Sequence, residues 1–241
     1  MSEELRPGDE AGAETLEIMS AAPRYNAWQY EVIAAHIGRR VLEVGSGIGN
    51  MSEQILTEPR DRVILTDIDP WYRGLLAQKF IDRPEVQVAE LCLPDPIAPE
   101  VFRGAQLDTV VALNVVEHIQ DDVGALTTIR QLLVRGGHAV ILVPAMDQLY
   151  GSLDQELGHF RRYTRRRLAT AFEKAGLHLV TMKWFNRVGT LGWWINARVR
   201  LRRRIPLQQL KAFDTLVPLL RLERFLPFPF GQSLIAVGTP A

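Results

Sequence analysis

The chain of 241 residues has the length of one large domain, and 47% hydrophobic with 23% charged residues is a globular composition. The single cysteine, Cys92, excludes a disulfide framework and any zinc or iron–sulfur site built from several cysteines, and we predict no metal site. The start of the chain is acidic, unlike a targeting peptide, and no apolar run approaches the roughly 18 residues of a membrane-spanning helix. We therefore expect a cytoplasmic protein.

The net charge of zero conceals an uneven distribution of charge. Residues 159–204 contain thirteen Lys and Arg and one acid, Glu173. Such a segment indicates an anionic neighbour, namely a lipid headgroup, a nucleic acid or an acidic partner. The alternative is a solvated surface whose charge is balanced by acids nearby.

Strand-like and helical segments alternate through the middle of the chain. The predicted strands are Arg40–Val44, Val63–Thr66, Val86–Glu90, Leu107–Asn114 and His138–Pro144. The helices predicted between them are Asn50–Leu56, Pro70–Phe80 and Asp122–Val134, the last stopped by Gly136-Gly137. This alternation predicts an α/β fold, Rossmann-like and doubly wound, which binds its ligands beyond the carboxyl ends of the strands.

The second half of the chain completes the sheet. We predict a helix at Arg165–Lys174, a strand near Leu177–Trp184 and a last strand at Ser233–Val237. The long connection between the two strands is expected to form helices of its own. The predicted organisation is an N-terminal helical segment (1–37), a core (38–186), a helical basic and aromatic lid (187–230) and a final core strand (231–241).

The strongest local signal is the glycine-rich turn after the first strand, Gly45-Ser46-Gly47-Ile48-Gly49-Asn50. Glycines there allow a tight turn and a close approach of the backbone to a ligand. Glu43 precedes the turn, and a buried carboxylate repels a pyrophosphate but suits a ligand that carries an ammonium and a sulfonium. The pattern therefore favours S-adenosylmethionine over NAD.

Acidic residues end the next two strands. Asp67 is placed to accept hydrogen bonds from both hydroxyls of a ribose, whereas its neighbour Asp69 is expected to cap the helix at Pro70. Glu90 is placed to accept from an adenine amino group, with Ile68 and Leu91 on either side of the ring. The alternative for Glu90 is a solvent-exposed acid at a strand end.

Four segments resemble the successive motifs of class I S-adenosylmethionine-dependent methyltransferases, in order and over residues 38–145. They are VLEVGSGIGN, LTDIDP, ALNVVEHI and LLVRGGHAVILVP. The resemblance implies a seven-stranded sheet with an antiparallel last strand, and cofactor contacts at Glu43, Gly45, Gly47, Asp67, Glu90 and Asn114. Glu90 departs from the pattern, since an Asp is commoner there. The full set of predicted cofactor contacts is Glu43, Gly45, Ser46, Gly47, Gly49, Asn50, Asp67, Ile68, Glu90, Leu91, Asn114 and Val115.

A short-chain dehydrogenase or epimerase is the rival enzyme class for such a sheet. That class needs a Tyr followed four residues later by a Lys. No tyrosine of the chain has one, and Tyr163 is followed at that spacing by Arg167. This rival is therefore not favoured.

The methyl acceptor is expected near the N-terminal segment, the loop after Pro144 and the lid. His159 is the first candidate general base because its ordinary pKa suits proton removal near neutral pH; His118 is the second. Their alternatives are a histidine bonded to the loop backbone and a packing residue. Arg161 and Arg162 could clamp an anionic group or pair with nearby acids. The predicted substrate contacts are Tyr25, Tyr150, Arg161, Arg162, Tyr163 and Trp194.

The lid supplies the last clue. Trp193-Trp194 beside the arginines of 198–204 resembles an interfacial amphipathic helix, which favours contact of residues 187–204 with a membrane surface or an amphiphilic substrate; the alternative is a closed small-molecule pocket. We therefore predict methyl transfer by in-line displacement to a small, partly apolar acceptor, with an anionic acceptor as one form of this prediction. Oxygen is the atom that we expect to be methylated. The alternative is a non-catalytic protein whose basic lid binds a membrane or a protein partner. Nucleic acid is not favoured as a substrate, because no Asn/Asp-Pro-Pro-aromatic motif occurs, although the arginines keep RNA open.

Overall fold

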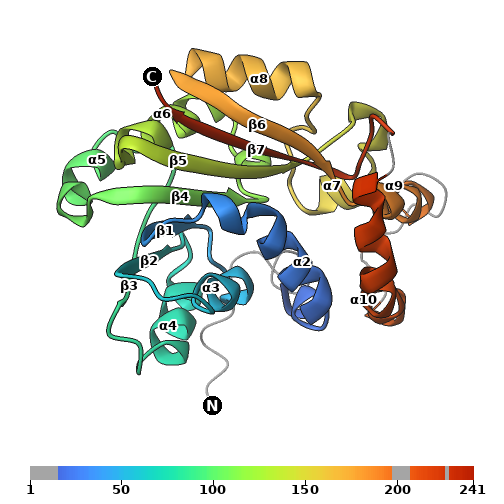
Figure 1. Cartoon of the computed structure of the whole chain (residues 1–241), viewed down its shortest axis with the longest axis horizontal. Helices are drawn as coiled ribbons and strands as arrows, with labels where there is room; N and C mark the ends of the chain where they lie inside the picture. The colour runs from blue at the N-terminus through green and yellow to red at the C-terminus, as the bar shows by residue number, and fades with distance from the viewer. Residues whose placement is uncertain (1–15, 197–206, 226–227) are drawn as a thin grey trace.

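The computed structural model describes residues 16–196, 207–225 and 228–241. Its centre is one seven-stranded sheet in the order β3-β2-β1-β4-β5-β7-β6. Strand β7 pairs antiparallel with β5 and β6, whereas the other neighbouring pairs are parallel. Figure 1 shows this order from β3 at the lower left to β6 at the top. The strands are β1 Arg40–Val44, β2 Arg62–Thr66, β3 Val86–Ala89, β4 Leu107–Leu113, β5 Leu133–Pro144, β6 Leu177–Phe185 and β7 Ser233–Pro240.

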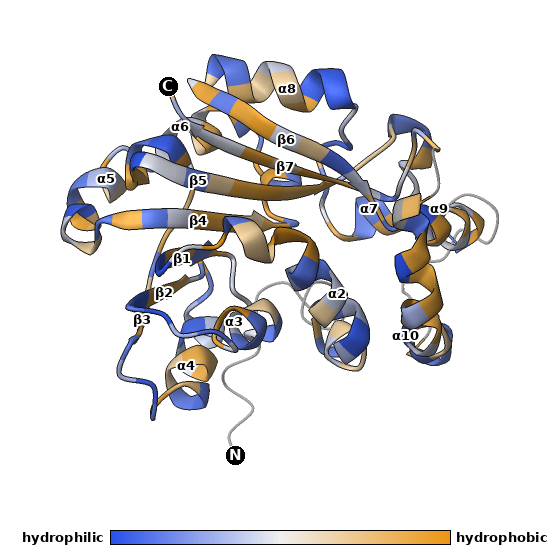
Figure 2. Cartoon of the chain, in the orientation of Figure 1, coloured by the Kyte–Doolittle hydropathy of each residue, from blue (hydrophilic) through white to orange (hydrophobic). Residues whose placement is uncertain are grey.

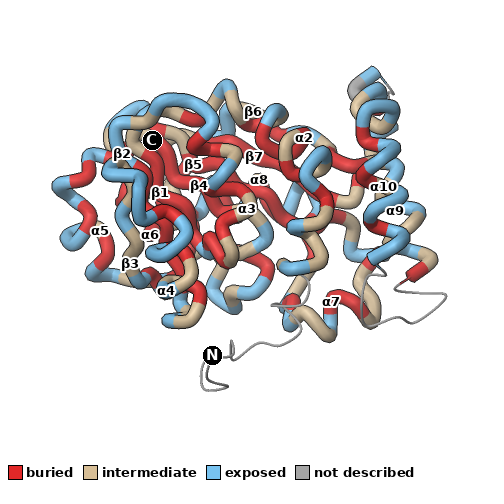
Figure 3. The backbone as a smooth tube through the Cα atoms, turned by 90° about the horizontal axis from the view of Figure 1, so that it is seen from below, coloured by how far each residue is buried: buried red, intermediate tan, exposed pale blue. Residues whose placement is uncertain are grey.

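Helices cover both faces of the sheet, and the strands between them are the most buried part of the chain (Figure 3). The α-helices are α2 Pro23–Ile33, α3 Asn50–Ile55, α4 Pro70–Lys79, α5 Ala98–Val101, α6 Asp122–Leu132, α7 Ser152–Glu156, α8 Arg165–Lys174, α9 Arg187–Trp194 and α10 Leu207–Leu220. Short 3-10 turns are η1 Ala34–His36, η2 Arg103–Ala105, η3 Val116–His118, η4 Asp147–Leu149 and η6 Arg221–Phe225. The predicted doubly wound fold, with its antiparallel last strand, is confirmed.

Two hydrophobic cores lie on opposite sides of the sheet. One packs Leu126 of α6 and Phe172 of α8 against the strands. The other packs Ile33 of α2, Ile55 of α3 and Val217 of α10. Full burial of such side chains is the main source of stability for a sheet covered on both faces.

The boundary between α6 and β5 differs from the prediction. The helix ends at Leu132 and the strand begins at once with Leu133, before the glycine pair that was expected to stop the helix. Leu133 pairs with Leu107 of β4, and the register shifts before Thr109 pairs with His138. Pairing across this irregularity extends β5 toward the helix, so the glycines lie inside the strand.

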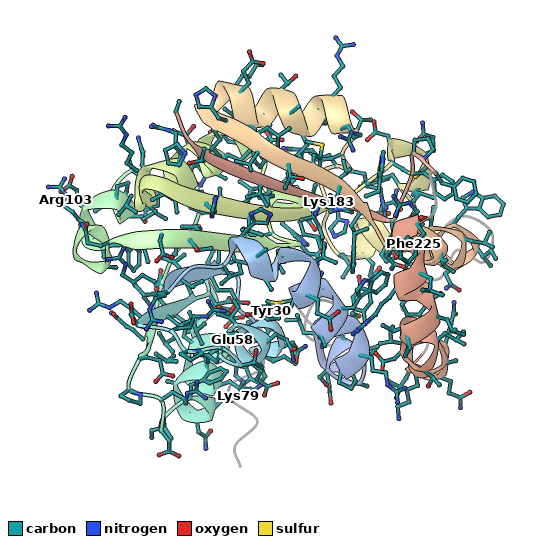
Figure 4. All side chains as sticks on the ribbon, in the orientation of Figure 1. Tyr30, Glu58, Lys79, Arg103, Lys183 and Phe225 are labelled. Atoms are coloured by element: carbon teal, nitrogen blue, oxygen red, sulfur yellow. The ribbon has the colours of Figure 1, made fainter. Side chains whose placement is uncertain are left out.

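Helix α10 and the turn η6 lie against α2. The backbone N–H of Tyr25 donates to Asp214 of α10 (2.8 Å), and Arg221 pairs with Glu31 (3.0 Å). Figure 2 shows how hydrophobic α10 is. Exposed apolar residues remain here, including Phe225, 70% exposed and labelled in Figure 4. Arg198–Arg204, central to the predicted membrane contact, lie outside the described residues.

Helix α2 is tied to the sheet by its polar groups as well as by its core face. The Tyr30 hydroxyl, labelled in Figure 4, accepts a hydrogen bond from Arg60 in the loop before β2 (2.6 Å). Arg60 also donates to the carbonyl of Ile37 (3.1 Å), so one guanidinium joins α2 to the segments that precede β1 and β2. Among the helices that the structure describes, none is both long and apolar enough to span a bilayer.

Candidate functional site

A cavity of about 880 Å³ opens beyond the carboxyl ends of β1, β2, β4 and β5. This is where a doubly wound sheet binds its ligands, and the volume suits a cofactor together with a small second molecule. The cavity brings together ten of the twelve predicted cofactor residues, which are Glu43, Gly45, Ser46, Gly47, Asn50, Asp67, Ile68, Leu91, Asn114 and Val115.

The glycine-rich turn forms the floor of the cavity next to β1. Gly45 and Gly47 have φ angles of 67° and 54°, a left-handed conformation that L side chains rarely adopt. A Cβ on Gly45 would lie 2.8 Å from the side chain of Val115, so a side chain there would push the fourth-strand loop away. The turn therefore needs glycine for its conformation and for its space.

Glu43 is a buried carboxylate under this turn. It is 5% exposed, and Ser52 of α3 donates its hydroxyl to Oε2 (2.5 Å). Burial, opposed by the hydrogen bonds from Ser52 and Ser46 and helped by the nearby charge of Asp67, raises the pKa of Glu43 to about 7. A carboxyl group with this pKa becomes ionised when a cation binds beside it.

Asp67 holds the turn in place from the end of β2. Its Oδ2 accepts from the N–H of Gly47 and its Oδ1 from the N–H of Asp69, both at 2.9 Å. Burial raises the pKa of Asp67 in spite of these bonds. Asp69 caps α4 as predicted, since its side chain accepts from the N–H of Trp71 (2.8 Å).

Two predicted cofactor residues lie outside the cavity. The carboxylate of Glu90 faces solvent and pairs with Arg73 (2.8 Å), so the adenine contact predicted for it is not supported by this geometry. Neighbouring side chains of an extended chain point in opposite directions, and the inward position belongs to Leu91. Gly49 lies against α4, where an added Cβ would be 3.0 Å from Phe80.

His159 and Arg162 share one buried carboxylate at the other side of the cavity. Asp154 of α7 is 0% exposed, and its Oδ1 lies 2.8 Å from Nδ1 of His159 and 2.8 Å from Nε of Arg162. Burial opposes the charge of Asp154, but the bonds from His159 and Arg162 outweigh it and lower its pKa. Both His159 and His118 line the cavity, with ring centroids 4.7 Å apart.

The predicted substrate residues separate into two groups. Tyr25 and Arg162 line the cavity. Tyr150 and Arg161 instead line a separate hollow of about 240 Å³, where Arg161 pairs with Asp122 (3.0 Å).

The other two substrate residues also lie outside the cavity. Tyr163 is fully buried, and its hydroxyl donates to Asp122 (2.8 Å), which makes it a core residue. Trp194 is 45% exposed, and its neighbour Trp193 takes the predicted place by packing over the Arg162 guanidinium, 4.8 Å from the ring centroid. The helical turn of α9 decides which of the two indoles faces inward.

Sequence reasoning missed two buried acids of the site. Glu117 of η3 is 0% exposed, neither carboxylate oxygen has a hydrogen-bond partner in another residue of the described ranges, and burial raises its pKa to about 8. Asp154 was considered only as a surface partner for arginine. The acids of VVEHI and LDQE are the signals that could have drawn attention to them.

A glycine turn above two buried carboxylates, at the carboxyl edge of such a sheet, defines a nucleoside-binding enzyme of the class I methyltransferase type. The chain belongs to the family described as "Methyltransferase domain", whose model matches residues 13–182. The chain thus contains a methyltransferase domain, and this family membership supports an enzyme that uses S-adenosylmethionine over the non-catalytic alternative.

Curated relatives share part of this region. The chain is 30% identical over 121 residues to the tRNA U34 carboxymethyltransferase of Pseudomonas aeruginosa, which covers 47% of this chain and 36% of that protein. It is 28% identical over 116 residues to the compactin diketide synthase mlcB of Penicillium citrinum, covering 46% of this chain and 4% of that protein. In both cases the match spans less than half of the relative.

Solved structures share the fold over nearly the whole chain. A putative methyltransferase in complex with the Haloferax volcanii Trm112 activator has a TM-score of 0.63 at 18% identity, covering 99% of this chain and all of that one. Geranyl diphosphate methyltransferase in complex with SAM has a TM-score of 0.62 at 14% identity, covering 98% and 93%. These likenesses concern the fold.

The cavity also fits S-adenosylmethionine on chemical grounds. Glu43 and Asp67 give it two buried carboxylates for a cationic nucleoside, and no Lys or Arg comes from the glycine turn to receive a pyrophosphate. The glycine backbone leaves open the space that side chains would fill.

The raised pKa of Glu43 predicts that cofactor affinity depends on pH. Below about pH 7 the free protein holds a proton on Glu43 that the cation must displace, so affinity falls by up to about tenfold per pH unit and levels off above. In Glu43→Gln the affinity should be low and independent of pH, as measured by calorimetry from pH 5.5 to 8.5. An unchanged pH profile in the variant would contradict this role.

The same group affects stability with the opposite trend. The folded pKa of about 7 exceeds the ordinary value of 4.5, so the folded form holds its proton more tightly than the unfolded form. The contribution of protonated Glu43 to the free energy of unfolding is therefore complete below about pH 4.5 and is lost as the pH rises to about 7. Glu43→Gln lacks this loss, and urea unfolding without cofactor should find it the more stable protein at pH 8.

Proposed function

We propose that this methyltransferase methylates a hydroxyl oxygen of a small, partly apolar molecule. The observation that supports this most is the His159–Asp154 pair, whose histidine lines the same cavity as Glu43 and Asp67. A histidine oriented by a carboxylate is a common general base, since the bond to Nδ1 leaves Nε2 directed elsewhere.

The cofactor-binding roles follow from position. Asp67 would hold the ribose hydroxyls, Glu43 would balance the positive charge of the methionine end, and Ile68 with Leu91 would enclose the adenine. Asn114 and Val115 complete the wall from the end of β4, where the Asn114 N–H is held by the carbonyl of Leu142 (2.9 Å).

The bound cofactor supplies an electrophilic methyl group on a sulfonium. His159 takes the proton of the acceptor hydroxyl, and the oxygen provides the electron pair of the new C–O bond while the C–S pair stays on sulfur. Asp154 stabilises the imidazolium that forms, and Arg162 keeps Asp154 in place. Most of the rate should come from positioning the two reactants in line.

The walls of the cavity describe the acceptor. Leu157, Ile119 and Trp193 give it apolar surface near His159. Arg162 also lines the cavity, but Asp154 already balances its charge. The expectation of an anionic group on the acceptor is therefore supported only by the number of arginines in residues 159–204.

The basic and aromatic lid supports a more specific proposal, in which the acceptor of the methyl group is amphiphilic. Val188, Leu191 and Trp194 of α9 are 47%, 63% and 45% exposed, which gives α9 an apolar surface, and the arginines of 198–204 follow this helix in the sequence. The relative that by its name acts on tRNA makes RNA the second acceptor class to test. A cytoplasmic location stays a prediction of the sequence.

The experiment is a transfer assay with radioactive S-adenosylmethionine and three sets of acceptors, namely small hydroxylated molecules, hydroxylated lipids in vesicles, and tRNA. We expect transfer to the first or second set, with the label stable to base as an ether. Base-labile label would indicate an ester, and transfer confined to tRNA would contradict the proposal.

A further inference from the structure

A buried carboxylate at the cavity is unexplained by methyl transfer as derived above. Glu117 follows β4 in the turn η3, is 0% exposed, and neither of its carboxylate oxygens has a hydrogen-bond partner in any other residue that the structure describes. Leaving such a group unpaired away from water costs several kcal/mol or forces it to stay neutral. A fold that places it beside a ligand cavity indicates a missing partner.

The neighbours of Glu117 are two histidines. One ligand atom each of Glu117, His118 and His159 lie within 4.8 Å of one another. Two imidazoles and one carboxylate are a ligand set that binds zinc in catalytic sites and other divalent first-row metals in oxygenases, with positions left open for a substrate.

The surroundings of His159 match those of a metal ligand. Asp154 holds Nδ1 at 2.8 Å, which leaves Nε2 as the nitrogen available to an ion. Metal-binding histidines almost always have such a carboxylate or carbonyl on the other nitrogen, because it fixes the ring and makes the ligand more basic. Arg162 in turn fixes Asp154.

Charge and distance allow an ion to enter. The cation of Arg162 is balanced by its buried bond to Asp154, so the ionised Glu117 adds a negative charge that a divalent ion would neutralise. Ligand atoms about 2.1 Å from a tetrahedral ion lie about 3.4 Å apart. The spacing must therefore contract, and His118 is the exposed member of the three.

We propose that Glu117, His118 and His159 bind one divalent transition-metal ion at the acceptor end of the cavity. Both histidines line that cavity, so the open positions of the ion face it. This metal site deepens the proposed function. Its consequence for catalysis, that the acceptor oxygen binds the ion, rests on that proposed function. A hydroxyl bound to a divalent cation is a stronger acid and releases its proton to water. In the metal-loaded enzyme His159 then acts as a ligand, and the metal replaces the base.

The test uses the untagged full chain, stripped with EDTA and titrated with Zn²⁺ and with Mg²⁺ by calorimetry. We expect one Zn²⁺ per chain and weaker Mg²⁺ binding, because imidazole suits zinc. Glu117→Gln and His118→Ala should each weaken Zn²⁺ binding by about 100-fold or more. His36→Ala is the matched control, since His36 forms another histidine pair with His138 (5.5 Å between centroids) far from Glu117 in the chain, and it should bind as the wild type does.

The outcomes separate the two proposals. No heat with Zn²⁺ up to 100 μM, or equal affinity in Glu117→Gln and wild type, would overturn the metal site. His118→Ala keeps the test valid if the buried substitution fails to fold, which thermal unfolding checks. Failure of methyl transfer to every hydroxyl acceptor, with Zn²⁺ binding intact, would instead count against the proposed function.

Discussion

We expect His159→Ala to lower kcat by about 10²–10⁴-fold, the usual contribution of a positioned base. Affinity for S-adenosylmethionine should stay within about twofold of the wild type, because His159 follows β5, whereas Glu43 and Asp67 lie at the ends of β1 and β2 on the other side of β4. Single-turnover transfer and calorimetry measure the two quantities separately. Undiminished turnover would remove His159 from the chemistry.

This variant removes a base and a metal ligand at once, so it needs a partner experiment. Glu117→Gln removes the proposed metal ligand but leaves the His159–Asp154 pair intact. If His159 acts as a base alone, that second variant keeps its turnover and EDTA has no effect. Parallel losses in both variants, together with inhibition by EDTA, indicate the metal-dependent reaction.

The second large effect concerns Asp67. Replacing it by Ala removes the acceptor of two backbone N–H groups and of the proposed ribose bonds, and hydrogen bonds to a charged group contribute about 1.5–3 kcal/mol each. We expect cofactor affinity to fall by about 100-fold or more while the fold is retained. Calorimetry gives the affinity, and circular dichroism checks the fold.

Asp95→Ala is the matched control for that variant. Asp95 also accepts a backbone N–H, from Ile97 at 2.8 Å, but it lies outside the cavity. Its substitution should cost stability without changing affinity. Equal affinities of Asp67→Ala and the wild type would contradict the ribose assignment.

The sheet and the cofactor end of the site were predictable because their signals are local. A strand that runs into Gly45-Ser46-Gly47 has few conformations open to it, and an acid two residues before the first glycine must lie beneath the turn. Asp67 and Asn114 follow from the same logic, since each ends a parallel strand at the same edge.

The acceptor end was less predictable because it depends on contacts between distant segments. Nothing near Tyr163 in the sequence shows that Asp122 receives its hydroxyl, nor does the Trp193-Trp194 pair show which indole meets Arg162. The position of Glu90 outside the cavity has a local reason, the alternation of side chains beyond a strand that ends one residue earlier than predicted. Glu117 shows its importance only through burial without a partner.

The central claim is that buried carboxylates at the head of the sheet select a cationic nucleoside. It is tested most directly by titrating the purified chain with S-adenosylmethionine and, separately, with NAD. The account predicts one S-adenosylmethionine bound per chain, lost on Asp67→Ala, and no heat from NAD. Binding of NAD with no response to S-adenosylmethionine at hundred-micromolar concentrations would contradict it.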